Sequence, residues 1–300
     1  MSWYDDLNAL RAWAAQARPI LICGMARSGT SVLQLALARH PALFPVPSVL
    51  ETFIFRLPRN LLDEPAKPML QGYLGGHDQL AALRARLDRL AGGDAATLDD
   101  NDLIRAFFAH ATSDVYPGRR PLEKTPSHVH ALERVFAVFP QARVLACVRE
   151  PLDVADSYRR RLQQDKAAGK PPESWAWLDV DDDILIRRFR KNDRSLQAAA
   201  ALAKGRVFQV PYTWLTTEPQ PALEAICAFI EEPFDPVLLE PHREFHAQAA
   251  RRLAGPIGAA SAPAERVLNA TQTATLQRKT HRLAQRWRVP GLIHPTDGDE

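Results

Sequence analysis

The residues whose types and spacing most clearly suggest a binding or catalytic role lie in a glycine-rich loop from Gly24 to Ser31. An apolar run precedes the loop and a helical pattern follows it, and in such a strand–loop–helix unit the backbone amides and the helix N-terminus bind phosphate groups. Gly24 and Gly29 allow the backbone turns that aim those amides at an anion. The loop therefore predicts a phosphate-binding site. Its side-chain donors are Arg27, Ser28, Thr30 and Ser31.

The loop departs from the G-x-x-x-x-G-K-[ST] pattern of nucleoside triphosphatases. Thr30 stands where those enzymes have the lysine that contacts the β- and γ-phosphates, and the basic residue of the loop is Arg27. A later apolar run ends in Val148-Arg149 rather than in the aspartate that helps to hold magnesium. We therefore expect a phosphate compound other than a magnesium triphosphate, and no metal site.

A second motif begins where the apolar run at 143–148 ends. Arg149 offers a forked guanidinium at the end of the predicted strand, and Pro151 suits the first turn of the helix that follows. Ser157, eight residues after Arg149, can add a hydroxyl from that helix to the same anion. An ion pair of Arg149 with Glu150 or Asp153 is the alternative.

These motifs resemble those of sulfotransferases that use 3′-phosphoadenosine 5′-phosphosulfate (PAPS). GMARSGTS is similar to their 5′-phosphosulfate loop, in which Lys or Arg is normal at the position of Arg27, and CVREPLDVADSYRR resembles their 3′-phosphate motif. RVFQVPYTWLTTEP resembles a strand and turn whose tyrosine contacts adenine, although Thr213 replaces a glutamate. The donor-binding residues that the resemblance implies are Arg27, Ser28, Gly29, Thr30, Ser31, Arg149, Ser157 and Tyr212.

The resemblance also implies a reaction and its catalytic residues. Sulfuryl transfer needs a base for the acceptor proton, positive charge at the sulfuryl and leaving oxygens, and exclusion of water. Arg27 is then the cation at the bridging oxygen, and Lys124 in PLEKTPSHVH is similar to the sulfonate-facing lysine of carbohydrate and tyrosyl-protein sulfotransferases. Glu51 lies about where those enzymes have a glutamate base. Weaker alternatives for the base are His128, Glu123 and His77.

Short apolar runs alternate with helical periodicity, which is typical of βαβ units. The predicted strands are Ile20–Cys23, Arg143–Val148 and Arg206–Val210, and the helices that follow them are at 31–39, 152–163 and 221–230. We expect an α/β protein with a P-loop-containing three-layer fold and a central parallel sheet, formed as a single domain over residues 1–300.

Two segments, 56–120 and 164–200, break this alternation and are predicted to be helical insertions on the acceptor side of the fold. Within the first, helices are expected at His77–Leu90 and Asp102–His110. The aromatic residues of this side either line an apolar channel or form the core of the insertions. They are Phe53, Phe55, Tyr73, Trp175 and Trp177.

Composition excludes several classes of protein. The chain of 300 residues is 46% hydrophobic with a net charge of +3 spread along its length, which argues against a nucleic-acid partner. No apolar run approaches the ~20 residues that a membrane span needs. Asp5 and Asp6 stand where a secretory signal has basic residues. We expect a cytoplasmic, bacterial-type protein whose three dispersed cysteines are buried side chains.

The function predicted from sequence is transfer of a sulfuryl group from PAPS to a hydroxyl or amine of a small-molecule or glycan acceptor, with release of adenosine 3′,5′-bisphosphate. The alternatives are a P-loop nucleotide kinase with a degenerate loop, and a non-catalytic nucleotide-binding protein. Arg251 and Arg252 are possible further contacts to the 3′-phosphate. Neither the acceptor nor the oligomeric state is indicated.

Overall fold

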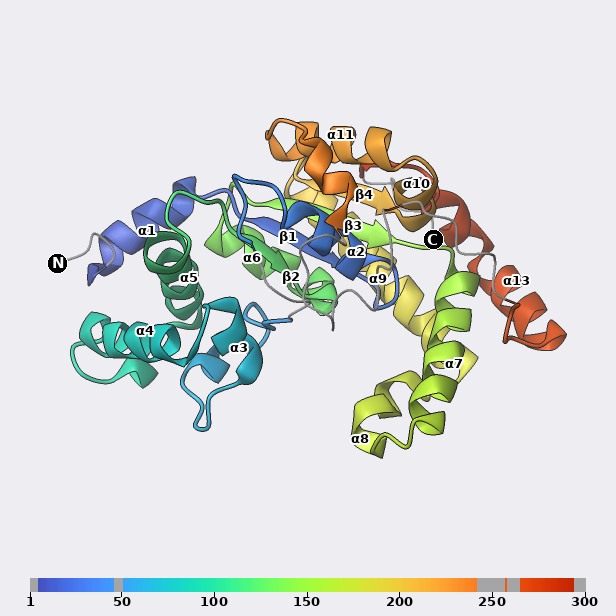
Figure 1. Cartoon of the computed structure of the whole chain (residues 1–300), viewed down its shortest axis with the longest axis horizontal. Coiled ribbons are helices and arrows are strands. Elements are labelled where there is room, and N and C mark those ends of the chain that lie inside the picture. Colours follow the sequence, from blue (N-terminus) through green and yellow to red (C-terminus); the bar gives the residue numbers. More distant parts are fainter. Residues whose placement is uncertain (1–4, 46–50, 242–256, 258–264, 294–300) are drawn as a thin grey trace.

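A computed structural model describes residues 5–45, 51–241, 257 and 265–293 (Figure 1). A five-stranded sheet in the order β2-β1-β3-β4-β5 runs through the middle of the molecule. The first four strands in this order are parallel, and β5 is antiparallel to β4. The strands are β1 (Ile20–Gly24), β2 (Leu122–Lys124), β3 (Arg143–Val148), β4 (Val207–Pro211) and β5 (Gly291–Leu292).

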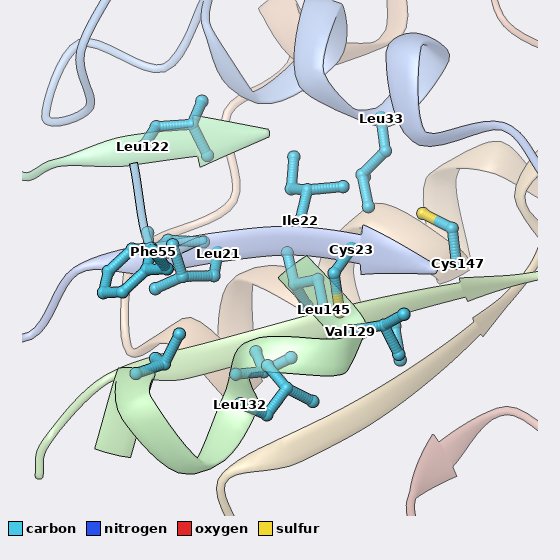
Figure 2. Close-up of a cluster of buried hydrophobic side chains, with 14 of the residues drawn as sticks. Leu21, Ile22, Cys23, Leu33, Phe55, Leu122, Val129, Leu132, Leu145 and Cys147 are labelled. Atoms are coloured by element: carbon cyan, nitrogen blue, oxygen red, sulfur yellow. The ribbon is translucent and has the colours of Figure 1, made fainter. Parts of the chain in front are cut away.

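Both faces of the sheet are covered, which explains why its central strands are continuous apolar runs. Every residue of β1 is buried. Figure 2 shows Ile22 on the same side of β1 as Leu33 of helix α2, whereas the side chain of the next residue, Cys23, points toward Val129. The two faces alternate because successive side chains of a strand point in opposite directions. The predicted α/β class and layered arrangement are confirmed.

The helices follow the predicted alternation, and the two insertions are helical. Figure 1 shows α3, α4 and α5 at one end of the molecule and α7, α8 and α13 at the other. The bounds are α1 (Leu7–Gln16), α2 (Thr30–Leu37), α3 (Pro68–Tyr73), α4 (His77–Leu90), α5 (Asp100–His110), η5 (Pro126–Ala131), α6 (Leu132–Val138), α7 (Pro151–Ala167), α8 (Pro172–Trp175), α9 (Asp182–Leu202), α10 (Tyr212–Thr217), α11 (Pro219–Ile230) and α13 (Ala270–Arg286).

The aromatic side chains of the first insertion belong to the core. Tyr73 and Phe55 are 2% and 1% exposed, and both pack against Phe108. The Tyr73 hydroxyl donates to the carbonyl oxygen of Leu122 at 3.0 Å, which ties α3 to the edge strand β2. The channel alternative is therefore wrong for these two residues. Trp177 instead lies on the surface, 44% exposed.

The structure also tests two predictions made from composition. Cys23, Cys147 and Cys227 are all buried, as expected. No helix in the described ranges is long and apolar enough to span a membrane.

Candidate active site

The register of the parallel strands brings the predicted motifs to one edge of the sheet. Gly24 at the end of β1 pairs with β3 two residues before Arg149. The end of β3 pairs with the end of β4, directly before Tyr212. On the other side of β1, Lys124 at the end of β2 pairs with Ile22. Ligands of such sheets bind at the carboxyl ends of the strands, so this edge is the candidate active site.

The two glycines of the loop are both required by its geometry. A Cβ atom at Gly24 (φ 138°) would lie 2.1 Å from the carbonyl oxygen of Cys147, and one at Gly29 (φ 93°) would lie 2.5 Å from the ring of Tyr212. Arg27 also has a positive φ of 72°. A positive φ is uncommon for a residue other than glycine and stores backbone strain at this position. The loop is therefore a tight structure built against β3 and Tyr212.

The loop presents donors that suit an anion. Helix α2 begins at Thr30 after Gly29, and no side chain caps its first turn. The Ser28 hydroxyl is buried, with the residue 1% exposed, and it has no hydrogen-bond partner within the described part of the chain. A buried hydroxyl left in this state costs about 1–3 kcal/mol. A phosphate or phosphosulfate group in the loop would accept its hydrogen bond, so the residues present fit that group.

The second motif folds against the loop. Arg27 Nε donates to Ser157 Oγ at 3.0 Å, and Arg149 Nη1 donates to the carbonyl oxygen of Arg27 at 3.3 Å. The Arg149 guanidinium lies 4.3 Å from the centroid of the Tyr212 ring, in a cation–π contact. The structure thus brings together all four residues, which lie far apart in the sequence.

Arg149 does not form the alternative ion pairs expected from its neighbours. Glu150 instead accepts from Arg288 at 2.9 Å, and Asp153 pairs with Arg266 at 3.2 Å. Among the residues that the structure describes, Arg149 takes part in no ion pair, and its buried Nε has no hydrogen-bond partner. Its positive charge is therefore not neutralised by a carboxylate of the described residues.

A cavity of about 510 Å³ adjoins Arg149 and Tyr212. Its walls come from the ends of β3 and β4, from α10 and from the residues that follow α13. Sequence reasoning missed the residues after α13, because no motif marks them. Arg251 and Arg252, suggested as late basic residues, lie outside the described residues, and Arg288 occupies the rim instead. The lining side chains include Arg149, Glu150, Tyr212, Thr213, Trp214, Thr217, Trp287 and Arg288.

Lys124 and Glu51 meet at the edge strand. Lys124 Nζ donates to Glu51 Oε1 at 2.9 Å. The lysine side chain is fully buried, whereas 38% of the glutamate side chain is exposed. A buried ammonium group needs a partner charge, and Glu51 supplies it from a side chain that is itself partly exposed.

The weaker alternatives for the base lie elsewhere. His128 and Glu123 are hydrogen-bonded to each other, and their remaining polar atoms bond to Thr52, Thr125 and the amide of Phe55. The His77 side chain is 75% exposed at the start of α4.

The three consecutive arginines of α7 each form an ion pair with a carboxylate. The pairs are Arg159–Asp182, Arg160–Asp156 and Arg161–Asp165.

The described residues hold no group of three or more His, Cys, Asp or Glu side chains that could bind a metal ion. Aspartate is absent from the end of β3, where Val148 is followed by Arg149. The anion donors of this edge are therefore amides, hydroxyls and guanidinium groups.

Solved structures of other proteins share this fold. The sulfotransferase domain from the curacin biosynthetic pathway matches with a TM-score of 0.60 and 20% identity, over 89% of this chain and 98% of that domain. The sulfotransferase domain from the Synechococcus PCC 7002 olefin synthase matches with a TM-score of 0.58 and 21% identity, over 91% of this chain and 96% of that domain.

Comparison of the amino-acid sequence with known proteins identifies the family to which this chain belongs. An uncharacterized protein of Aquifex aeolicus (strain VF5) is 25% identical over 230 residues, which make up 74% of this chain and 26% of that protein. This chain thus spans about a quarter of the length of that relative. The profile of the Sulfotransferase family matches residues 19–236, a range that contains the loop, the second motif, Glu51 and Lys124. This match extends over more than half of the chain, and the protein belongs to the Sulfotransferase family.

Proposed function

We propose that this protein transfers a sulfuryl group from PAPS to a hydroxyl or amine of a small-molecule or glycan acceptor. Family membership supports sulfuryl transfer in general. The single observation that supports the donor is the meeting of the glycine loop with Arg149 and Ser157, at which a buried Ser28 hydroxyl and the Arg149 Nε have no partner among the described residues.

In this proposal three parts of the site bind three different groups of PAPS. The first turn of α2, with Ser28, Thr30 and Ser31, holds the 5′-phosphosulfate. Arg149 and Ser157 hold the 3′-phosphate. The cavity beside Tyr212 takes the adenine, where an aromatic wall can stack on the base.

The chemical step uses the residues at the edge strand. Glu51 accepts the proton of the acceptor as the acceptor oxygen or nitrogen forms its bond to sulfur. The bond between sulfur and the bridging oxygen breaks in line, and its electron pair stays on the 5′-phosphate of adenosine 3′,5′-bisphosphate. Lys124 and Arg27 stabilise the negative charge on the sulfonate and bridging oxygens. Lys124 already pairs with Glu51, so the cation and the base of this proposal lie side by side.

Calorimetric titration tests the donor. The protein is titrated with adenosine 3′,5′-bisphosphate, with adenosine 5′-monophosphate and with ATP plus magnesium. We expect tight binding of the bisphosphate only. Arg149→Ala removes charge-assisted hydrogen bonds worth about 1.5–3 kcal/mol, and should weaken binding about 10-fold to 100-fold.

Arg161→Ala is the matched control, because Arg161 lies on α7 but pairs with Asp165. It should leave bisphosphate binding within about 2-fold of the wild type, since Asp165 keeps its second partner, Lys170, when Arg161 is lost. Preference for ATP plus magnesium, or equal binding with and without the 3′-phosphate, would contradict the proposal and favour a nucleotide kinase.

A further inference from the structure

A buried carboxylate lies directly behind the proposed transfer site. Glu123 is 0% exposed and stands between Leu122 and Lys124 on β2. Successive side chains of a strand point to opposite faces, so Glu123 faces the layer of η5 while Lys124 faces the layer of α2. A buried carboxylate is tolerated only where several hydrogen bonds satisfy it.

Three side chains donate to this carboxylate. The hydroxyls of Thr52 and Thr125 donate to Glu123 Oε1 at 2.7 and 2.6 Å. His128 Nδ1 lies 2.9 Å from Oε2. Burial by itself would raise the pKa of Glu123, but the His128 ring and the two hydroxyls outweigh it and hold the pKa below its usual range. A carboxylate oxygen that accepts two hydroxyl hydrogen bonds fits the ionised form of Glu123.

The hydrogen bonds also assign the proton on His128. The backbone amide of Phe55 donates to Nε2 at 3.4 Å, so Nε2 must carry a lone pair. The ring proton is then on Nδ1, where it is donated to Glu123. The ring consequently bridges β2 and the segment of residues 51–55.

The same two hydroxyls hold the backbone of that segment. Thr125 Oγ1 accepts from the amide of Phe53 at 3.4 Å, and Thr52 Oγ1 accepts from the amide of Ile54 at 3.3 Å. Phe53 has a φ of 55°. A bulky side chain rarely adopts this conformation, which persists only where its surroundings hold it. The three consecutive amides from Phe53 to Phe55 thus all end on this cluster.

We infer that Glu123, together with Thr52, Thr125 and His128, positions the proposed base Glu51 against Lys124. We call these four residues the Glu123 anchor. The inference rests on the proposed function, because the role of Glu51 is itself proposed. Glu123 touches no substrate and acts only through the segment that it holds.

The geometry of the edge strand makes this positioning specific. Adjacent residues of the segment contact adjacent residues of β2: Glu51 pairs with Lys124 on one face, and Thr52 bonds Glu123 on the other. The segment of residues 51–55 therefore contacts both faces of β2. Sliding it by one residue would break both contacts at once, so the anchor sets the register in which the base meets the lysine.

A pair of variants at Thr52 tests the anchor. Thr52→Val removes the hydroxyl but keeps the branched shape, whereas Thr52→Ser keeps the hydroxyl. Amide hydrogen exchange of the peptide 51–57, followed by mass spectrometry, should be about 10-fold faster in Thr52→Val than in the wild type, because a hydrogen bond to a charged group is lost. Thr52→Ser should restore slow exchange. Equal exchange in the two variants overturns the inference.

The second readout is sulfuryl transfer from PAPS. Thr52→Val should lower kcat about 10-fold and leave the Kd for adenosine 3′,5′-bisphosphate within about 2-fold, and Thr52→Ser should recover kcat. Equal kcat in the two variants also overturns the inference. If the wild-type protein transfers no sulfuryl group and binds no bisphosphate, the proposed function fails, and the exchange comparison alone decides whether the anchor holds the segment.

Glu123→Gln provides a stronger perturbation, with Asp102→Asn as its control. Asp102 is also buried and hydrogen-bonded, but to Arg11 and Arg105 on the α1–α5 side of the molecule. Faster exchange of peptide 51–57 in Glu123→Gln and not in Asp102→Asn supports the anchor; the same exchange in both contradicts it. The two Thr52 variants give the answer if Glu123→Gln does not fold.

Discussion

At the donor end of the site, Arg149 takes part in no ion pair among the described residues, whereas at the transfer end Lys124 is paired with Glu51 at 2.9 Å. The donor end comprises the loop at 24–31 with Arg149 and Ser157, at the ends of the central strands. The transfer end lies at the edge strand β2, with the Glu123 anchor behind it. Arg149 and Lys124 both carry positive charge, but of these two only Lys124 is neutralised by a carboxylate.

The difference follows from what each end has to bind. A site for phosphate groups binds more tightly when its cations are not already neutralised by the protein. A site that removes a proton needs a carboxylate within reach of the acceptor, and the neighbouring ammonium group holds that carboxylate in place. We therefore expect substitutions at the two ends to have separable effects on binding and on rate.

The largest expected effect comes from Glu51→Gln. Loss of a general base lowers rates by about 10²–10⁴-fold, whereas the donor end is untouched, so the Kd for adenosine 3′,5′-bisphosphate should stay within about 2-fold. Transfer from radiolabelled PAPS across an acceptor panel gives the rate, and calorimetry gives the Kd. Glu173→Gln, on the surface of α8, is the control. Parallel losses of binding and rate would show that the two ends are not separate.

Gly29→Ala should weaken bisphosphate binding about 10-fold or more. Its Cβ atom would lie 2.5 Å from the Tyr212 ring, so the loop or the ring has to move. Gly92→Ala is the control, because Gly92 also has a positive φ but nothing within 4 Å of an added Cβ atom. Both variants lose about 1–2 kcal/mol of stability through the backbone. Weaker binding in both would indicate that stability, and not the loop, is responsible.

The pH dependence of the Tm should show whether the Glu123 carboxylate stabilises the folded protein. In the folded state the pKa of Glu123 lies below its usual range, because the His128 ring and the two threonine hydroxyls outweigh the effect of burial. Its stabilising contribution is therefore present above the pKa of the unfolded state and is lost as the pH falls through the lower pKa of the folded state. The Tm of Glu123→Gln should fall less steeply than that of the wild type between about pH 5 and pH 3. Parallel Tm curves would argue against a buried anion at this position.

The smallest expected effect comes from Arg288→Ala at the rim of the donor cavity. Arg288 is paired with Glu150 and its side chain is 71% exposed. Such exposed pairs are worth about 0–1 kcal/mol, so bisphosphate binding should weaken by about 2-fold to 5-fold. Arg282→Ala, on the exposed surface of α13, should have no effect. A loss as large as that of Arg149→Ala would move the main 3′-phosphate contact to the C-terminal residues.

Much of the donor end was predictable because its residues are local. The glycine loop and the eight-residue spacing from Arg149 to Ser157 follow from short-range patterns, as does the helix His77–Leu90 in the first insertion. The roles of the site residues and the single-domain organisation stay predictions. The strand β2 was missed because the three residues Leu122–Lys124 include two charges and show no apolar run. Such a strand is recognisable only through its pairing with β1.

The sequence by itself determined the α/β class, the phosphate loop and the second motif, because periodicity and backbone freedom are properties of neighbouring residues. Only the tertiary structure decided that Glu123 is buried and that Phe55 and Tyr73 belong to the core. A glutamate is almost never fully buried without partners, and the partners of Glu123 include Thr52, which lies 71 positions earlier in the chain. Burial and pairing of this kind arise from contacts across the fold, and they place Glu51, the proposed base, beside Lys124.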